Sequence, residues 1–211
     1  MRTNICIKLK NLLIAIYINK TGEKMIIQER KLKGVFEIQL EPKEDNRGYF
    51  MRVYDDEIYK KHGIHRNWVQ ENHSLSVQKG TLRGFHFQIP PAAETKLVRV
   101  ISGEIYDVFV DLRIGSPTFG KWGSVILSEK NKKMLYIPRG FAHGMCTLMD
   151  NSAMYYKVDN YYTPEKEYCI RWDDPQLAVQ WPLEGKPIIS EKDSKAKSFK
   201  EFIQKYGGIE L

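Results

Sequence analysis

One stretch of the chain shows its local structure most clearly: Thr81-Leu82-Arg83-Gly84-Phe85-His86-Phe87-Gln88. Polar and apolar side chains alternate along it, which is typical of a β-strand, because successive side chains point to opposite faces of a sheet. The stretch therefore predicts a strand with two different faces, one carrying Gly84, His86 and Gln88 and the other carrying Arg83, Phe85 and Phe87.

A second stretch with the same period precedes it, from Trp68 to Leu75. Gln70, Asn72 and Ser74 fall on one face of this predicted strand. A buried polar group without a partner costs about 1 to 3 kcal/mol, so amide and imidazole groups are unusual in the wall of a purely structural core. We therefore expect these polar faces to line a ligand cavity.

Short runs of this kind recur from Gly34 onward, separated by Gly, Pro, Asn and Asp. Such spacing is typical of a sandwich or barrel of antiparallel strands, so the fold is expected to be mainly β. The expected strands are 35–40, 49–54, 68–75, 81–88, 97–101, 104–112, 122–127, 134–137, 144–148, 154–158 and 168–172.

Helical periodicity is clear only near the C-terminus. Phe199, Phe202, Ile203 and Tyr206 follow the i, i+3, i+4, i+7 pattern, and two glycines follow them. A shorter helix is expected over residues 55–62. The sequence shows no internal repeat, low-complexity tract or linker, so residues 25–211 are expected to form one domain.

The composition bounds the class of partner. With 42% hydrophobic and 28% charged residues, the 211-residue chain suits one well-cored domain. The formal net charge is +7, but the first 24 residues hold five basic side chains and one acidic, so the rest carries about +3. This mixed-sign surface lacks the positive stripe that phosphate-backbone binding needs, so no nucleic-acid partner is expected.

Residues 1–24 differ from the rest of the chain. The apolar run from Leu12 to Ile18 resembles a short signal-peptide core, but no small-residue cleavage site follows it, and it is too short to span a bilayer. We expect an N-terminal extension, with an upstream mis-assigned start favoured over an anchor and no membrane partner.

Cys6, Cys146 and Cys169 are odd in number and widely spaced, which favours a reducing cytoplasm over a disulfide framework.

Several ordered motifs together resemble the dTDP-4-dehydrorhamnose 3,5-epimerase family. Each alone is weak, but they occur in order over about residues 30–195. They are Asp45–Phe50, Gln70–Ser74, Leu82–Gln88, Lys96–Val100, Asp107–Arg113, Ser116–Gly120, Ile137–Gly144, Trp172–Pro175, Trp181-Pro182 and Ser190–Asp193.

The resemblance implies a fold and an activity. The fold would be a double-stranded β-helix, that is, a cupin or jelly-roll barrel with a short C-terminal helix, assembled as a homodimer. The activity would be an isomerase that inverts C-3, C-5 or both of a nucleoside-diphosphate 4-keto sugar, such as dTDP-4-dehydro-6-deoxyglucose. It would require no cofactor and no metal, and such sugars normally feed surface polysaccharide synthesis.

The resemblance also implies roles for single residues. His86 matches the general base, Asp193 the carboxylate that orients it, and Tyr156 the residue that returns a proton to the opposite face. A proton beside a ketone needs a base near neutral pKa and donors aimed at the developing oxyanion, which suits these residue types. The groups that would line the sugar or nucleotide are Gln70, Asn72, Arg83, Lys96, His143 and Tyr161.

Arg47 and Phe50 match the family's nucleotide clamp, with Arg47 available to pair with a diphosphate and Phe50 to stack on a base. Many dTDP-specific members place Glu two residues after that Phe, where this chain has Arg52. The exchange replaces an acceptor by a donor and reverses the charge, so the base preference stays open.

Each assignment has a structural alternative. His86 and His143 would be satisfied barrel histidines, Tyr156 a packing residue, Lys96 a rim charge and Asp193 an N-terminal cap or first-turn carboxylate. Two other functions also stay open. One is a metal-dependent cupin enzyme, although His86-Phe87-Gln88 supplies Gln where a metal site usually has a second His. The other is a non-catalytic module that binds a nucleotide sugar.

Overall fold

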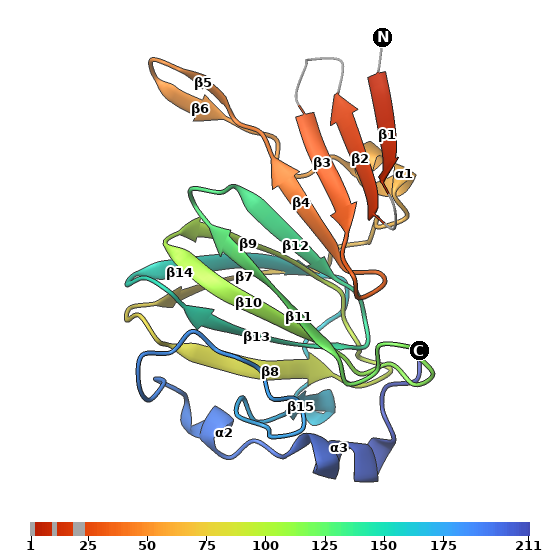
Figure 1. Ribbon diagram of the computed structural model, residues 1–211, viewed down its shortest axis with the longest axis vertical. Helices are drawn as coiled ribbons and strands as arrows, with labels where there is room; N and C mark the ends of the chain where they lie inside the picture. Colours follow the sequence, from red (N-terminus) through yellow and green to blue (C-terminus); the bar gives the residue numbers. More distant parts are fainter. Residues whose placement is uncertain (1–2, 10–11, 19–23) are drawn as a thin grey trace.

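The computed structural model describes residues 3–9, 12–18 and 24–211, and most of its strands lie antiparallel in two facing sheets (Figure 1). The larger sheet runs in the order β1 (Thr3–Leu9), β2 (Leu12–Ile18), β3 (Lys24–Glu29), β4 (Phe36–Leu40), β12 (Lys133–Ile137), β9 (Lys96–Ser102), β14 (Ser152–Val158) and β7 (Gln70–Ser76). The smaller sheet runs in the order β11 (Trp122–Ser128), β10 (Glu104–Asp111), β13 (Phe141–Thr147), β8 (Leu82–Gln88) and β15 (Glu167–Cys169).

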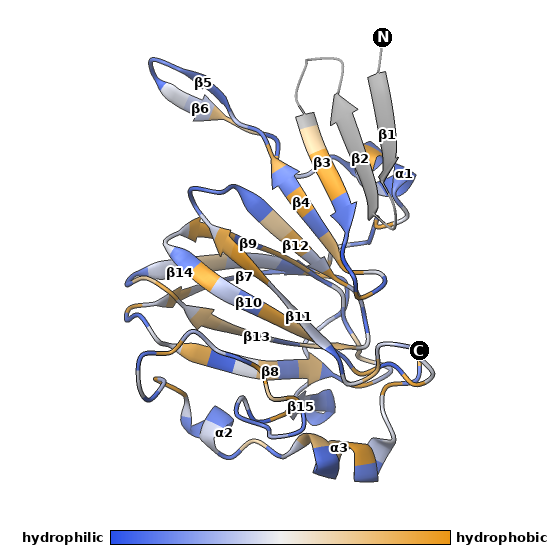
Figure 2. Cartoon of the chain, viewed as in Figure 1, coloured by the Kyte–Doolittle hydropathy of each residue, from blue (hydrophilic) through white to orange (hydrophobic). Residues whose placement is uncertain are grey.

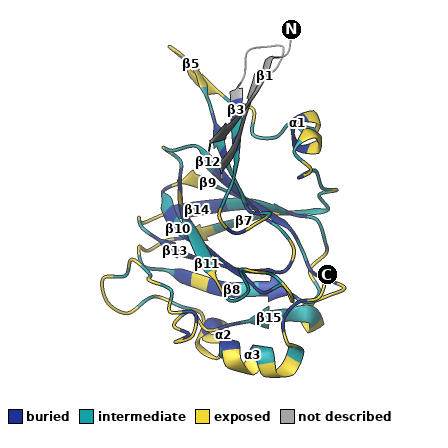
Figure 3. Cartoon of the chain, turned by 45° about the vertical axis from the view of Figure 1, so that its right-hand side comes forward, coloured by how far each residue is buried: buried dark blue, intermediate teal, exposed yellow. Residues whose placement is uncertain are grey.

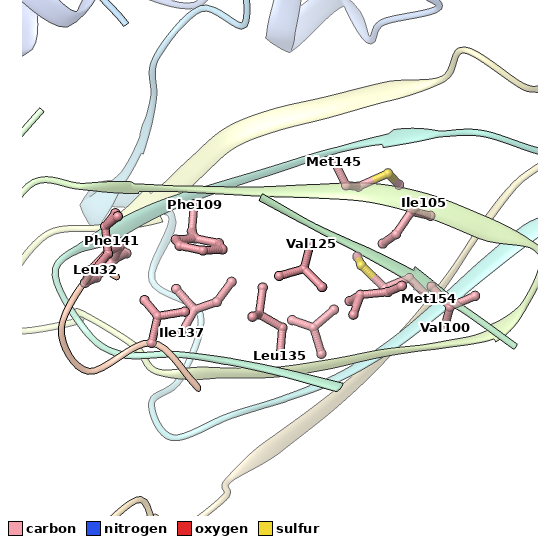
Figure 4. Packing of buried hydrophobic residues seen from close by; sticks show 13 residues of the cluster. Leu32, Val100, Ile105, Phe109, Val125, Leu135, Ile137, Phe141, Met145 and Met154 are labelled. Atoms are coloured by element: carbon pink, nitrogen blue, oxygen red, sulfur yellow. The ribbon is translucent and has the colours of Figure 1, made fainter. Parts of the chain in front are cut away.

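Neighbouring strands within each sheet are mostly distant in sequence, since the chain crosses repeatedly from one sheet to the other. This is the connectivity of a jelly roll, and it confirms the expected mainly β barrel. The main core lies between the two sheets, where strands from both contribute fully buried side chains such as Ile105, Phe109 and Leu135 (Figure 4). Burial of these apolar faces holds the two sheets together.

A second core covers the outer face of the smaller sheet. Phe85 and Phe87 of β8 pack there with Trp181 and with Phe202 of the C-terminal helix α3 (Phe199–Tyr206), whose opposite side is exposed (Figure 3). Ser198 and Glu201 form a capping box at the start of α3. Polar and apolar residues alternate along β8, as its sequence predicts (Figure 2).

The segment after β4 departs from the prediction. A strand was expected over 49–54, but the structure has a small projecting hairpin, β5 (Lys43–Asp45) and β6 (Gly48–Phe50), followed by irregular chain (Figure 1). Met51, Val53 and Tyr54 pack against a third apolar cluster instead of pairing, and Asp55 then caps α1 (Asp56–Lys61). Packing of their side chains outweighs the β-propensity of this stretch.

The N-terminal part adds to the larger sheet. β3 begins next to Met25, where the globular part was expected to start, and pairs with β4. β1 and β2 pair with each other, and β2 pairs with β3, so they continue the sheet beyond it. The other residues of the expected extension lie outside the described part of the chain. In the described ranges, no helix has the length and apolarity needed to cross a bilayer.

Candidate active site

A polar cavity of about 120 Å³ lies at the end of the barrel where β9 begins and β14 ends. Its wall comes from both sheets and from the loops beside them. The lining residues are Gln70, Asn72, His86, Phe87, Gln88, Glu94, Lys96, Tyr156, Val158, Tyr162 and Glu167. Five sequence-predicted residues therefore meet here, and the polar face expected for β7 is confirmed, since its odd-numbered neighbours are exposed.

His86 and Asp193 form the central pair of this site. The Nε2 atom of His86 lies 2.5 Å from Oδ1 of Asp193, whose side chain is only 2% exposed. Burial by itself raises the pKa of a carboxyl group, but the hydrogen bond from His86 and its charge outweigh burial here and lower the pKa of Asp193. The carboxylate can therefore fix the imidazole tautomer and stabilise a positive charge on the ring.

Local structure explains how Asp193 reaches a histidine 107 residues away. The chain before it is held against β8, because the Leu82 amide donates to the carbonyl of Ile188. Ser190 then caps the short helix α2 (Glu191–Ser194) by accepting from the Asp193 amide. Asp193 therefore lies in the first turn of α2, as its structural interpretation predicts, and it is also the partner of His86.

Gly84 brings β8 unusually close to β13. Its φ is +122°, and a Cβ atom there would lie 2.5 Å from the Cα of Gly144 and 2.7 Å from the carbonyl of His143. Only glycine fits both the backbone angle and the approach. As a result His86 and His143 are direct cross-strand partners and face the barrel interior together.

His143 forms a second, closed pair. Its Nε2 atom lies 2.8 Å and 3.0 Å from the two carboxylate oxygens of Asp107, which is fully buried on β10. His143 lies beside the cavity but does not line it. Sequence reasoning missed Asp107, although its place two residues from Phe109 on an alternating strand puts it on the inner face.

Lys96 is buried and paired. Its Nζ atom lies 3.2 Å from Glu94, whose other oxygen accepts from the amide of Gln88 at 2.6 Å. Gln88 also accepts from the amide of Thr163 at 2.6 Å, which ties this chain of contacts to the loop after β14. Lys96 is therefore not an ordinary rim charge, and Glu94 and Gln88 set its position.

The two adjacent tyrosines take different positions. Tyr161 is 66% exposed and lies outside the cavity, whereas Tyr162 lines it and donates to Glu167 at 2.7 Å. Glu167 lies 2.5 Å from Lys192 as well, and despite partial burial these two partners lower the pKa of its carboxyl group. Sequence reasoning chose Tyr161 over its neighbour Tyr162 and missed Glu167 and Lys192, because no periodic pattern covers this part of the chain.

The remaining predicted residues lie away from the cavity. Arg83 is exposed and donates to Ser76 and to the carbonyl of Leu75 on β7. Arg47 and Phe50 sit on the projecting β5–β6 hairpin, where Arg47 pairs with Asp45 and Phe50 is 61% exposed. Within this chain the hairpin therefore does not reach its own cavity.

Cys169 of β15 lies behind the central pair, opposite His86 in the sheet. Its Sγ atom is 3.5 Å from Oδ1 of Asp193, and burial together with that carboxylate raises the pKa of the thiol to about 12. The thiol therefore keeps its proton at neutral pH.

The structure also has a larger cavity of about 450 Å³ near Phe109 and Trp122, but the residues that line it include no histidine–carboxylate pair.

A jelly-roll barrel whose cavity is walled by a histidine–carboxylate pair, a buried lysine and a tyrosine is equipped to move protons on a polar substrate. The fold and the site are thus those of a jelly-roll protein that can transfer protons, which is the chemistry that an isomerase of this class requires. Residues 29–201 match the family model described as dTDP-4-dehydrorhamnose 3,5-epimerase, and the chain belongs to this family.

Individual relatives agree with this assignment. The enzyme of that name from Neisseria gonorrhoeae is 48% identical over 155 residues, a match covering 74% of this chain and 47% of the relative. A Legionella pneumophila dTDP-6-deoxy-D-glucose-3,5-epimerase, solved with dTDP-4-keto-L-rhamnose, is 43% identical with a TM-score of 0.80. This match covers 83% of this chain and 93% of that structure. A Bacillus anthracis dTDP-4-dehydrorhamnose 3,5-epimerase, solved with TDP and pyrophosphate bound, is 40% identical with a TM-score of 0.81. This match covers 83% of this chain and 99% of that structure.

Proposed function

We propose that this protein epimerises a nucleoside-diphosphate 4-keto sugar, such as dTDP-4-dehydro-6-deoxyglucose, at carbons beside the ketone. The observation that carries the proposal is the His86–Asp193 pair at the wall of a polar cavity. The cavity is smaller than the 300 Å³ or so of a typical ligand pocket, so it suits the sugar ring and leaves the nucleotide at its mouth.

In the proposed mechanism His86 is the general base. Its Nε2 atom is engaged by Asp193, so Nδ1 is the atom that takes the proton from the carbon beside the ketone. The electron pair of the broken C–H bond moves onto the ketone oxygen as an enolate. Lys96, held in place by Glu94, supplies positive charge to that oxygen.

Inversion needs a proton donor on the other face of the ring. Tyr156 lies on β14 of the larger sheet, across the barrel from His86 on the smaller sheet, and both line the cavity. We assign Tyr156 this role: its hydroxyl returns a proton to the enolate carbon, the phenolate regains one from solvent, and His86 releases its proton to solvent. Gln70 and Asn72, hydrogen-bonded to each other at 3.1 Å, offer polar contacts to the sugar.

The test of this function is proton exchange with solvent. The full chain is incubated in deuterated water with a panel of dTDP-, UDP-, GDP- and CDP-linked 4-keto sugars. We expect deuterium at C-3, at C-5 or at both in an inverted product, and the panel shows whether Arg52 changes the base preference. Binding of these sugars without any exchange would show a binding module instead.

We further propose a cytoplasmic homodimer in which residues 25–211 form the epimerase domain and each chain completes the other's site. Two observations support the assembly: the β5–β6 hairpin projects away from its own barrel (Figure 1), and it exposes Tyr49 and Phe50. Arg47 and Phe50 would then clamp the nucleotide bound to the partner chain.

Mixing two impaired variants tests this sharing of sites. In a heterodimer of His86→Ala and Phe50→Ala chains, one site has an intact base and an intact clamp. Random mixing by unfolding and refolding should therefore restore about a quarter of the wild-type sites, as two-fold symmetry requires. Activity no greater than the sum of the two variants would contradict the shared site.

A further inference from the structure

Cys169 has no part in the proposed epimerisation, yet its side chain lies directly beside the His86–Asp193 pair. β15 pairs with β8 so that Cys169 is opposite His86, and its thiol is 3.5 Å from the same Asp193 oxygen that His86 contacts. One ligand atom from each of these three residues lies within 4.8 Å of the others. An imidazole nitrogen, a thiol sulfur and a carboxylate oxygen thus lie close together.

We propose that His86, Cys169 and Asp193 form a binding site for Zn²⁺ that inhibits the enzyme when occupied. Nitrogen, sulfur and oxygen donors in tetrahedral arrangement are the set that Zn²⁺ prefers in proteins. Zinc bonds of about 2.0 to 2.3 Å put neighbouring ligand atoms roughly 3.3 to 3.8 Å apart. The Cys169–Asp193 spacing already fits, whereas the His86–Asp193 contact must lengthen by about 1 Å.

Charge and proton balance favour a divalent cation. On binding, Cys169 releases its proton to solvent, the proton on Nε2 of His86 moves to Nδ1, and no group is oxidised or reduced. Zn²⁺ then faces one thiolate and one carboxylate, so the occupied site is neutral, which suits a place where Asp193 is almost fully buried. Glu167, another carboxylate in the wall of this cavity, is already paired with Lys192 and Tyr162.

This site differs from the metal centre of a metal-dependent cupin. There a second ligand would stand at Gln88, two residues after His86, but the amide of Gln88 is engaged by Glu94 and Thr163. Here the second and third ligands come from β15 and α2. The cation would take the base out of use, since a zinc-bound imidazole whose Nδ1 carries a proton cannot accept the substrate's proton.

Co²⁺ and Zn²⁺ are the probes for the test. The full chain is stripped with EDTA, freed of chelator and titrated with Co²⁺, and the absorption of a thiolate–cobalt bond is recorded in the near ultraviolet. We expect one Co²⁺ per chain with this absorption, displaced by one Zn²⁺. Zn²⁺ should abolish deuterium incorporation into substrate, and added EDTA should restore it.

Two cysteine variants separate this site from adventitious binding. Cys169→Ala should keep metal-free activity, lose the cobalt–thiolate absorption and raise the Zn²⁺ concentration for half-inhibition by roughly tenfold or more. Cys169→Ser serves if the alanine variant does not fold. Cys146→Ala, at the other free cysteine among the described side chains, is the matched control and should behave as wild type.

Absence of the thiolate absorption in the wild type, or inhibition unchanged in Cys169→Ala, would overturn the inference. The metal-binding part does not depend on the proposed function, whereas the inhibitory part rests on it. A chain that is inactive without metal but binds Co²⁺ through Cys169 would refute the epimerase and keep the site.

Discussion

Two histidines lie side by side in the smaller sheet, and each pairs with an aspartate. The two pairs differ in what surrounds them. His86 is 31% exposed to the cavity and meets a carboxylate delivered by a distant C-terminal segment. His143, its cross-strand partner, is 8% exposed and meets Asp107 from the next strand. The same chemistry is thus placed once at a cavity wall and once inside the core, which predicts activity from the first pair and stability from the second.

The largest effect is expected from Asp193→Asn. The amide keeps the shape of the side chain but favours the wrong imidazole tautomer and cannot stabilise the protonated ring, so we expect kcat/KM to fall about 10³-fold. Steady-state kinetics measures the loss, with circular dichroism as the control for folding. A folded variant with kcat/KM within tenfold of wild type would remove the carboxylate from the mechanism.

Asp107→Asn should act on the other pair. Replacing this buried carboxylate disrupts its hydrogen bonds with His143, and we expect the free energy of unfolding to fall by about 3 kcal/mol. Urea denaturation measures it, and deuterium incorporation per folded molecule should change less than about tenfold. A stable variant that had lost its activity would make the closed pair part of the chemistry.

Tyr156→Phe separates proton removal from proton return. His86 can still remove the proton and give back deuterium from solvent on the same face, so exchange should persist. Inverted product should fall by about 10²-fold, because its donor is missing. NMR analysis of substrate and product gives both rates. Equal losses of exchange and inversion would assign Tyr156 to proton removal or binding instead.

The smallest effect concerns stability in acid. The pKa of Asp193 is lowered in the folded protein, so its carboxylate contributes stability above the unfolded pKa of about 4, and this is lost as the pH falls through the folded value. Between pH 6 and pH 3 the wild type should lose about 1 kcal/mol more stability than Asp193→Asn. Equal losses would mean that the pair does not stabilise the charged carboxylate.

The short alternating runs along the chain predicted a β-sandwich or barrel, and period-two alternation in β7 and β8 predicted one polar wall of the cavity. The ordered motifs placed His86, Lys96 and Tyr156 in one site through the family resemblance, whereas strand alternation by itself gave only the facing of His86. Asp107 was missed, since a lone carboxylate in an apolar strand shows nothing of its partner.

Loops were harder to predict than strands. Tyr161 and Tyr162 differ only in a turn of the backbone that no periodicity encodes, and Cys169 gains its neighbours from the pairing of β15 with β8. The roles proposed for Arg47 and Phe50 depend on the proposed second chain. These features arise from tertiary or quaternary contacts, which local sequence patterns do not specify.

The most direct measurement compares deuterium incorporation by His86→Asn and His143→Asn in parallel, each corrected for the folded fraction. We predict that His86→Asn remains folded and incorporates deuterium about 10³-fold more slowly than wild type, whereas His143→Asn loses mainly stability. Incorporation at the wild-type rate by folded His86→Asn would contradict the assignment of the cavity-facing pair as the proton-transfer centre.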